Sequence, residues 1–476
     1  MPEPDIAALV GYPDLVLVVS DLHLGDGQDP DTERYHKREN FFADRAFSAF
    51  LEHHDPRSRS GTTLLVINGD AFDFLRITNI PVTDADFAHW SDTLKQLGVH
   101  RPPDELRPLR PREVRYGLRT NDYKSVWKLR CIARGHPRFF AALGRWLEWG
   151  GWIVFVKGNH DLELYWPLVQ QAIRSEIGHA HPPARGGLER VLFCQECFQL
   201  GNLYIEHGHR FEATTAVKGA PTLPRAPSEL NLPLGSFVNR YIINRLEGLE
   251  PFLDNIKPVQ NLLWTLLRRH PGQVFSIARH ALPFLRRAAR PYWLRDGLGF
   301  GLYFLSILVQ LITIAGVALL ILWPEYRRTV TVSLPSASYV IAGLGILGPY
   351  LIGFIRDLLP RRRPKAGEDA FGEGMYGTIS ALGVRVDYPR LYGVVGHTHV
   401  PDVQRLPHIG RVEVLYLNSG TWIPKWDENR PDLTGRVVHT FIRFTKQPAG
   451  WYGHEHLQWL EQTRTASESV IFARGR

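Results

Sequence analysis

Two long apolar stretches in the middle of the sequence limit what this chain can fold into. Gly297 to Trp323 is a run of 27 residues without a charge, and Thr329 to Ile355 is a second uncharged stretch with the core YVIAGLGILGPYLIGFI. About 20 apolar residues are enough to cross the hydrocarbon core of a bilayer. Pro349 interrupts the second stretch, but membrane-spanning helices tolerate proline. We therefore predict a two-helix transmembrane hairpin, with spans at about residues 298–323 and 337–355, rather than two helices buried in a large core.

Basic residues beside the two stretches indicate how such a hairpin is oriented. Nine arginine or lysine residues flank its outer ends, whereas the connecting loop carries only Arg327 and Arg328. Cytoplasmic segments next to membrane spans are enriched in Lys and Arg. The N-terminal residues MPEPDIAALVGYPD also lack the basic and apolar regions of a signal peptide. The sequence therefore predicts a multi-pass protein of the inner (cytoplasmic) membrane, with its catalytic domain facing the cytoplasm.

Outside the hairpin, five short apolar runs each end in a cluster of polar residues. The runs are LVLVV (15–19), TTLLVI (62–67), WIVFV (152–156), LYI (203–205) and LYGVV (391–395), and they lead into SDLHLGD, NGDAFDF, KGNHD, EHGH and GHTH. Continuous apolar runs of this length are typical of strands buried on both faces. Polar residues directly after such strands predict a site built at strand ends.

The remaining patterns predict further helices and strands. The chain between Asp73 and Gly151 has helical patterning, including a helix over His136 to Trp149 with Pro near its start and Gly just after its end. Residues 412–417 and 437–444 are typical of strands, and so is the run from Val191 to Leu200. This last run contains the chain's single C-x-x-C, and without a second such pair it does not predict a zinc ribbon.

A long insertion separates the fourth polar cluster from the fifth. It begins with the Pro-rich stretch GAPTLPRAPSELNLPLG, which predicts a linker, and continues with basic amphipathic patterns. Basic amphipathic helices beside a membrane span are typical of an interfacial cap, although ordinary helices covering the domain would have the same pattern. The sequence thus divides into the first part of a catalytic domain (1–211), the insertion with its hairpin (212–375), the second part of the catalytic domain (376–450) and a C-terminal tail (451–476).

The polar clusters together contain a set of side chains that is typical of a metal centre. Mixed carboxylate, amide and imidazole donors suit Mn, Fe or Zn ions, and a carboxylate can bridge two of them. Two ions roughly 3.5–4 Å apart can clamp a phosphoryl group and activate a water for attack. In an extended segment residues i and i+2 point to one side, so D-x-H and H-x-H would both face the ions. The candidate ligands are Asp21, His23, Asp70, Asn159, His207, His397 and His399.

The series DLH, GDAFD, GNHD, HGH and GHTH resembles that of the calcineurin-like metallophosphoesterases, over about residues 14–210 and 376–445. The resemblance implies an α/β (α+β) fold, a four-layer sandwich of two β-sheets flanked by helices. It also implies two divalent ions, with Mn expected first and Fe or Zn as alternatives. His160 would protonate the leaving oxygen or neutralise the phosphate, oriented by Asp73. One ion would be held by Asp21, His23, Asp70 and His399, and the other by Asp70, Asn159, His207 and His397, with Asp70 bridging.

Within that superfamily the sequence is most similar in appearance to the UDP-2,3-diacylglucosamine hydrolases. The similar residues are DLHLGD, GDAFDF, GHTHVP and the later NSGTW. That family cleaves a pyrophosphate bond in a lipid precursor and carries a helical cap in the interval where this chain has its insertion. Two features differ: many of those enzymes have Arg at the position of His160, and they are generally peripheral rather than membrane-spanning.

The leading functional expectation is a membrane-anchored, metal-dependent hydrolase of a phosphate ester or pyrophosphate bond, with a lipid-linked substrate such as a UDP-diacylglucosamine as a candidate. The net charge of +8 agrees with an anionic partner. A phosphodiesterase or nuclease for soluble nucleotides or nucleic acid is an alternative, but the chain outside the membrane-proximal segment lacks a basic and aromatic stacking platform, so no specific nucleic acid is expected. A non-catalytic membrane sensor or scaffold is the alternative of another class, and such a protein would have lost ligands that are all present here.

Overall fold

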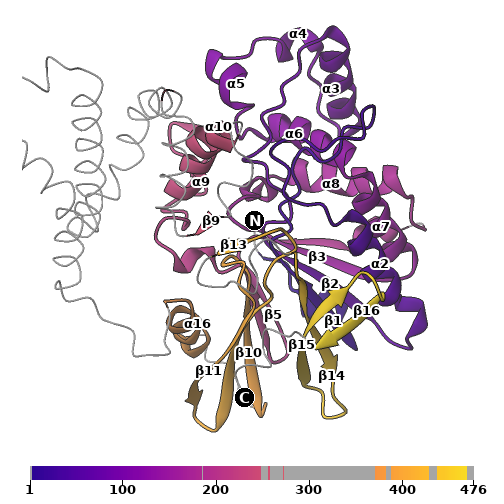
Figure 1. The fold of residues 1–476 in the computed structure, drawn as a ribbon, viewed down its shortest axis with the longest axis vertical. Coiled ribbons are helices and arrows are strands. Elements are labelled where there is room, and N and C mark those ends of the chain that lie inside the picture. Colours follow the sequence, from indigo (N-terminus) through magenta and orange to yellow (C-terminus); the bar gives the residue numbers. More distant parts are fainter. Residues whose placement is uncertain are drawn as a thin grey trace, which may run out of the picture. The chain divides into compact units, whose positions relative to one another are not determined.

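Two β-sheets lie at the centre of the described part of the chain in the computed structural model (Figure 1). The structure describes residues 3–184, 186–247, 256–257, 272, 370–381, 388–427 and 437–468. All of these residues belong to one compact unit. The five apolar runs that precede the polar clusters are all strands of the two sheets, as the sequence predicts.

The larger sheet has seven strands, and its middle strands carry the first three polar clusters. Strands β1 to β4 run parallel to one another, whereas β14 pairs antiparallel with β1 and continues into an antiparallel edge. In order across the sheet the strands are β16 (Thr465–Glu468), β15 (Tyr452–Leu460), β14 (His439–Lys446), β1 (Leu15–Val19), β2 (Thr63–Asn68), β3 (Trp152–Val156) and β4 (Val191–Cys194).

The smaller sheet has five strands and carries the last two polar clusters. Its three middle strands are parallel, and each edge strand pairs antiparallel with its neighbour. In order across the sheet the strands are β11 (Asp402–Ile409), β12 (Val412–Asn418), β10 (Arg390–Val395), β6 (Leu203–Glu206) and β5 (Cys197–Leu200). Since parallel strands end at the same edge of a sheet, the loops after β6 and β10 are neighbours, and so are those after β1, β2 and β3.

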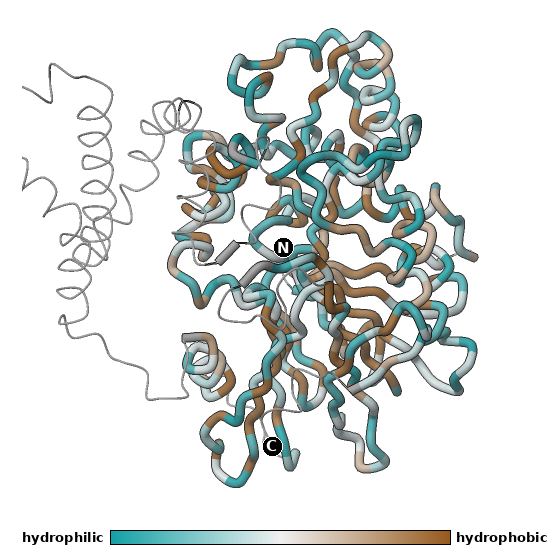
Figure 2. Tube along the Cα trace, viewed as in Figure 1, coloured by the Kyte–Doolittle hydropathy of each residue, from teal (hydrophilic) through white to brown (hydrophobic). Residues whose placement is uncertain are grey.

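Three hydrophobic cores separate four layers, as the alternation along β1 illustrates. Leu15, Leu17 and Val19 point into the core between the larger sheet and its helices. Val16 and Val18 point the other way, into the core between the two sheets. A third core lies between the outer face of the smaller sheet and helix α16. Hydrophobic residues accordingly concentrate along the strands, and the surface loops are mostly hydrophilic (Figure 2). The predicted sandwich of two sheets flanked by helices is confirmed.

Helices cover the outer face of the larger sheet and share one hydrophobic core with it. The helix predicted over His136 to Trp149 is α7, and the helical patterning between Asp73 and Gly151 corresponds to five helices. The helices are α1 (Ile6–Val10), α2 (Asp44–His53), α3 (Asp84–Gln96), α4 (Pro103–Leu106), α5 (Pro111–Tyr116), α6 (Asp122–Gly135), α7 (Pro137–Glu148), α8 (Pro167–Ala180), α9 (Leu234–Val238), α10 (Asn244–Glu247) and α16 (Ala370–Ala381), with a π-helical turn, η5 (Asn239–Ile243), between α9 and α10.

Two segments differ from the sequence expectation. The run from Val191 to Leu200 is not one strand: it divides at Gln195 and Glu196 into β4 and β5, which belong to different sheets. The segment 451–476, expected as a tail, supplies the edge strands β15 and β16 of the larger sheet. Tyr452 and Trp459 are buried there, so residues 452–468 belong to the sandwich.

The first part of the insertion packs against the sandwich instead of forming a linker. The Pro-rich stretch contains a two-stranded hairpin of β7 (Thr222–Leu223) and β8 (Ala226–Leu230). The backbone N–H of Leu230 donates to the hydroxyl of Thr120 at 2.9 Å, and the amide of Asn121 donates to the Ser228 carbonyl at 3.0 Å. Further along, β9 (Ile256–Lys257) pairs with β13 (Trp426–Asp427).

The predicted transmembrane spans, at about 298–323 and 337–355, lie outside the described residues, and so does most of the expected cap. Among the residues that the structure does describe, no helix has the length and apolar character needed to cross a bilayer.

Candidate metal centre

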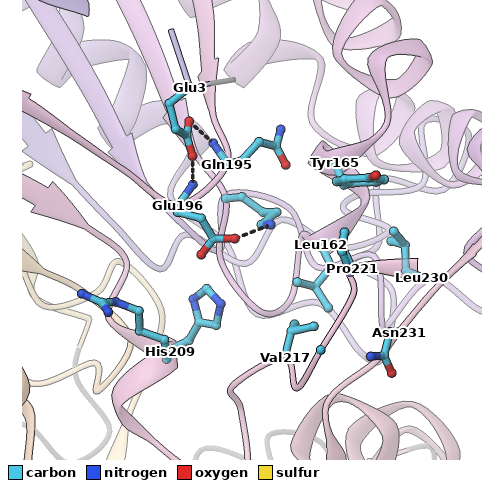
Figure 3. A pocket seen from close by; sticks show the side chains of 13 residues that line it. Glu3, Leu162, Tyr165, Gln195, Glu196, His209, Val217, Pro221, Leu230 and Asn231 are labelled. Atoms are coloured by element: carbon cyan, nitrogen blue, oxygen red, sulfur yellow. Dashed lines mark hydrogen bonds and ion pairs between the residues drawn. The ribbon is translucent and has the colours of Figure 1, made fainter. Parts of the chain in front are cut away.

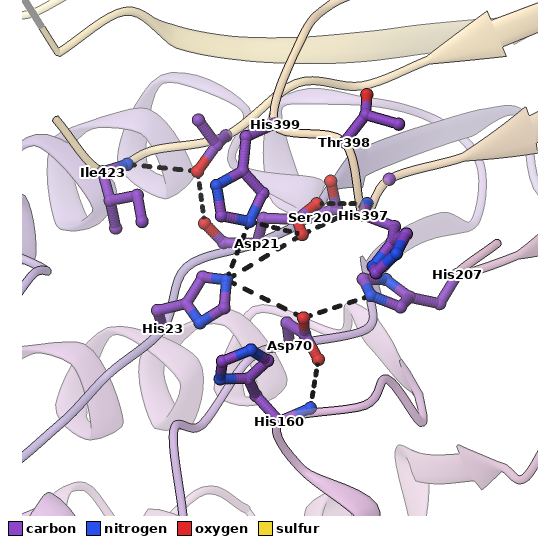
Figure 4. A network of polar contacts seen from close by, with 12 residues as sticks. Ser20, Asp21, His23, Asp70, His160, His207, His397, Thr398, His399 and Ile423 are labelled. Carbon is purple, nitrogen blue, oxygen red and sulfur yellow. Dashed lines mark hydrogen bonds and ion pairs between the residues drawn. The ribbon is translucent and has the colours of Figure 1, made fainter. Parts of the chain in front are cut away.

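Five loops bring the candidate ligands together at one edge of the two sheets (Figure 4). Asp21 and His23 follow β1, Asp70 follows β2 and Asn159 follows β3, while His207 follows β6 and the two histidines of GHTH follow β10. All of these side chains except His397 and His399 are almost completely buried. The donor atoms of six of them fall into two groups whose members lie within 4.8 Å of one another: Asp21, His23 and His399, and Asp70, His207 and His397.

The first group is centred on imidazole nitrogens that face one carboxylate. Nε2 of His399 lies 3.3 Å from Oδ1 of Asp21 and 3.0 Å from Nε2 of His23. Nε2 of His23 is 4.0 Å from the same Asp21 oxygen. Two imidazole nitrogens and a carboxylate oxygen that converge on one point form a donor set that suits a transition-metal ion.

Asp70 joins the two groups. Its Oδ2 lies 3.7 Å from Nε2 of His23, in the first group, and 3.2 Å from Nε2 of His207, in the second. Figure 4 shows this carboxylate between the two rings. One carboxylate oxygen between two imidazoles from separate groups is the arrangement expected of a bridging ligand.

Asn159 also supports the interpretation that these side chains bind metal ions. Its Oδ1 is buried and has no hydrogen-bond partner among the described residues. A buried amide oxygen without a partner is unfavourable by roughly 1–3 kcal/mol, so a ligand is the expected explanation. The backbone carbonyl of Asn159 is satisfied separately, because it accepts a hydrogen bond from the Ser236 hydroxyl at 2.9 Å. These donors therefore fit divalent ions.

The backbone at the ligands differs from the extended conformation that we expected. Asp21 and His23 have φ angles of 52° and 50°, His397 and His399 have φ angles of 67° and 60°, and Asp70 has a φ angle of 50°. Non-glycine residues rarely adopt this left-handed region, and such strain concentrates at functional sites. The D-x-H and H-x-H motifs thus present their side chains from tight, left-handed loops. His399 lies in the first group and His397 in the second, which is the division that the resemblance implies.

Two glycines of the motifs allow the loops to approach one another. A Cβ on Gly69 would collide with the ring of His207, and the φ of Gly69 is 81°. A Cβ on Gly158 would collide with the carboxylate of Asp70. The Gly in G-D and the Gly in G-N-H are therefore required because ligand side chains from neighbouring strands occupy the space that a side chain would need.

Asp73 connects His160 and His23. Its Oδ2 lies 3.0 Å from Nδ1 of His160, 3.2 Å from Nδ1 of His23 and 2.9 Å from Nε of Arg76. Because the guanidinium of Arg76 donates to the same oxygen, we interpret this cluster as a hydrogen-bond network and not as a third cation site. A carboxylate that accepts from Nδ1 leaves Nε2 of each histidine free to face a metal or substrate.

The pKa shifts of the two carboxylates also favour the binding of cations. Burial raises the pKa of Asp70, but the charges of His207 and His160 outweigh burial and lower it well below its usual range. Burial raises the pKa of Asp21 as well, and His399 reverses that effect so that the pKa is lowered. Burial lowers the pKa of His399 to about 4, which leaves its ring neutral at pH 7. Burial lowers the pKa of His207 too, but Asp70 outweighs burial and raises it to about 10, so this ring would lose a proton when it binds an ion.

Several residues that support the site were missed at the sequence level. Asp161, the last residue of GNHD, accepts from the backbone N–H groups of Gly158 at 2.6 Å and Ala71 at 2.8 Å, so it joins two of the loops. Its place within the motif was a signal that could have identified it. Glu212 lies 2.9 Å from Nε2 of His397, and no local pattern predicts that contact. The NSGTW motif acts through Thr421, whose hydroxyl donates to the Asp21 carbonyl at 2.6 Å.

A pocket of about 360 Å³ is lined in part by His209, a neighbour of His207 in the second group (Figure 3). The ring centroid of His209 is 5.5 Å from that of His207. Burial lowers the pKa of His209 well below its usual value, so this ring is neutral at pH 7. The lining combines apolar and polar side chains, among them Tyr165, Leu230 and the ion pair of Lys157 with Glu196 at 3.2 Å.

Comparison with known proteins adds no assignment. The sequence matches no model of a protein family and is not significantly similar to any curated protein.

Proposed function

We propose that this chain is a metal-dependent phosphoesterase with the sandwich fold and site of the calcineurin-like metallophosphoesterases. The observation that supports it most is the position of Asp70, whose carboxylate oxygen lies between His23 and His207 and so between the two groups of donors. Asp21, His23, Asp70 and His399 would hold one divalent ion. Asp70, Asn159, His207 and His397 would hold the second. Bound there, two such ions supply positive charge that stabilises the phosphoryl transition state and lowers the pKa of the attacking water.

His160 is the proposed proton donor to the leaving oxygen. Burial lowers its pKa, but the carboxylates of Asp73 and Asp70 outweigh burial and raise the pKa to about 9. The ring is therefore protonated at pH 7, as a general acid must be. Asp73 holds Nδ1 of the ring at 3.0 Å, and no partner for Nε2 lies among the described residues. The side chain is 15% exposed, so a substrate can reach that nitrogen.

The proposed substrate is an ester or pyrophosphate of a lipid, and the proposed location is the inner membrane with the site facing the cytoplasm. Two uncharged stretches and the asymmetry of basic residues around them support this part of the proposal. Manganese is the first candidate for the ions, and iron or zinc would suit the same donors.

The test is hydrolysis by the full chain in detergent. Protein stripped with a chelator should be inactive and should recover activity when Mn, Fe or Zn is added. The substrates are bis(4-nitrophenyl) phosphate and a lipid pyrophosphate in mixed micelles. Hydrolysis that survives chelation, or no hydrolysis of either substrate with any of the three metals, would contradict the proposed activity. Turnover of the soluble diester alone would retain the activity and reject the lipid substrate.

A further inference from the structure

The first helices of the insertion reach the loops that carry the candidate site. The hydroxyl of Ser236, in α9, donates to the carbonyl of Asn159 at 2.9 Å. The amide of Asn244, in α10, donates to the carbonyl of Leu75 at 2.6 Å. Both acceptors lie in site loops, one after β3 and the other after β2. The π-helical turn η5 separates the two donors, and π turns within helices occur frequently at functional sites.

The last residue of α10 extends these contacts to the proton donor. Glu247 is buried, and its carboxylate lies 2.8 Å from Nη1 and 3.2 Å from Nη2 of Arg76. Arg76 is also buried, and its Nε donates at 2.9 Å to the Asp73 oxygen that His160 contacts. The guanidinium is thus held by Glu247 of the insertion, by Asp73 and, through Nη1, by the carbonyl of Arg38 at 3.0 Å.

The geometry of the Arg76 guanidinium and the charges around it both allow a change at Glu247 to reach Asp73. A guanidinium has a rigid plane, so a two-point contact with Glu247 determines where Nε points. Buried charges are stable only when they are paired, and here one cation lies between two carboxylates. If Glu247 lost its charge, Arg76 would keep Asp73 and the Arg38 carbonyl as partners and would shift toward Asp73, and the Asp73 oxygen that contacts His160 would move with it.

We infer that Glu247 is a positioning residue for His160 and acts through Arg76 and Asp73. The inference rests on the proposed function, because it assigns the residue to the step in which His160 delivers a proton. The inference also implies that the first helices of the insertion help to support the active site, although the insertion lies far from the motifs in sequence.

The test separates a loss of proton delivery to the leaving group from a general loss of enzyme activity. Two esters with the same non-leaving group are compared, one with a 4-nitrophenolate and one with an alkoxide leaving group. An alkoxide requires protonation, whereas 4-nitrophenolate leaves without it. Glu247→Gln should lower kcat for the alkoxide ester by roughly 10- to 100-fold with an unchanged KM, the size expected for a misplaced catalytic group. The 4-nitrophenyl ester should be nearly unaffected. The ratio of the two rates does not depend on the fraction of folded enzyme.

Two further variants make the result specific. Glu229→Gln is the matched control: Glu229 also pairs with an arginine of the catalytic domain, Arg119, but has no contact with Asp73. It should leave both rates unchanged. In a His160→Ala background Glu247→Gln should cause no further loss, because residues that act through one group are not additive.

The following outcomes distinguish a failure of the proposed function from a failure of the role inferred for Glu247. If wild-type enzyme with Mn cleaves neither ester, the proposed function fails. If it cleaves both but Glu247→Gln slows them equally, or slows the His160→Ala enzyme as much as the wild type, Glu247 is only structural. Loss of bound metal in Glu247→Gln would place its effect on His23 and overturn the assignment to His160. A His160→Ala enzyme without leaving-group selectivity would overturn it too.

Discussion

Two buried networks of histidine and carboxylate side chains have similar chemistry and different surroundings. In one, Asp73 joins His160, His23 and Arg76 beside the candidate metal centre. In the other, His136 lies between Glu39 at 3.2 Å and Asp44 at 3.0 Å, where the end of α6 meets α7 and α2. Opposing carboxylates raise the pKa of both histidines despite burial, to about 9 for His160 and about 10 for His136. The pKa alone therefore does not distinguish a catalytic histidine from a structural one.

The surroundings of His160 and His136 do distinguish the two histidines. Both ring nitrogens of His136 face a carboxylate, the ring is fully buried, and Glu39 also accepts the backbone N–H of Phe41 at 2.7 Å. Beside His160, in contrast, Asp70 has a left-handed backbone, and the donor atoms of six candidate ligands converge in two groups. Backbone strain and converging metal-type donors mark the site that has a ligand to bind. The comparison predicts that substitutions in the first network affect rate and those in the second affect stability.

The largest effect is expected for Asp70→Asn. Because this carboxylate faces both donor groups, its loss should weaken both ion sites and lower kcat/KM by more than about 10⁴-fold. Steady-state kinetics and metal analysis of the purified variant measure this. The same substitution in the other network, Asp44→Asn, is the control and should leave the rate per folded molecule near that of the wild type. A fully active Asp70→Asn enzyme would rule out a two-metal site.

His160→Ala should produce the next largest effect. Loss of the proton donor should reduce kcat by about 10²–10⁴-fold, the usual range for general acid–base catalysis. Bound metal should remain at the wild-type amount, because Nδ1 of His160 faces Asp73 and not the two donor groups. Metal loss in this variant would instead make His160 a part of the metal site.

His136→Ala should lower the stability of the protein and leave the turnover number nearly unchanged. The change leaves the carboxylates of Glu39 and Asp44 without the cation between them, so the free energy of unfolding should fall by about 3–5 kcal/mol. Denaturant titration measures this loss. The turnover number of the folded fraction should change by less than about twofold, since the network has no contact with the reacting groups. A large loss of turnover at full stability would assign His136 to catalysis.

The smallest effect is a dependence of stability on pH. The folded-state pKa of His136, about 10, lies above the ordinary value of 6.5, so its contribution is fully present below pH 6.5 and is lost as the pH rises through 10. The free energy of unfolding of wild-type protein should therefore fall by roughly 2–4 kcal/mol more than that of His136→Gln between pH 6 and 10. Parallel curves for the two proteins would show that His136 is neutral in the folded state.

Much of the fold was predictable because its signals are local. LVLVV and WIVFV lack alternation because both faces of the larger sheet are covered, by helices on one side and by the smaller sheet on the other. Strand β15 also carried a short signal, since Leu457 and Trp459 are buried while Gln458 between them is partly exposed. The change of sheet at Gln195 and Glu196 had no comparable signal, because β4 and β5 are both short and mostly apolar, and the sheet to which each belongs depends on the strand with which it pairs.

The sequence by itself determined which residues form the candidate site: each ligand follows an apolar run, and strand ends and their loops are set by interactions over a few residues. Only the tertiary structure decided how these residues meet. It gave Asp21, His23, Asp70, His397 and His399 a left-handed backbone instead of an extended one, and it brought Glu212 to His397. It also brought Glu247 to Arg76. The physical reason is that such contacts depend on the pairing and packing of strands and helices that lie far apart in the chain, and neither spacing nor local composition specifies them.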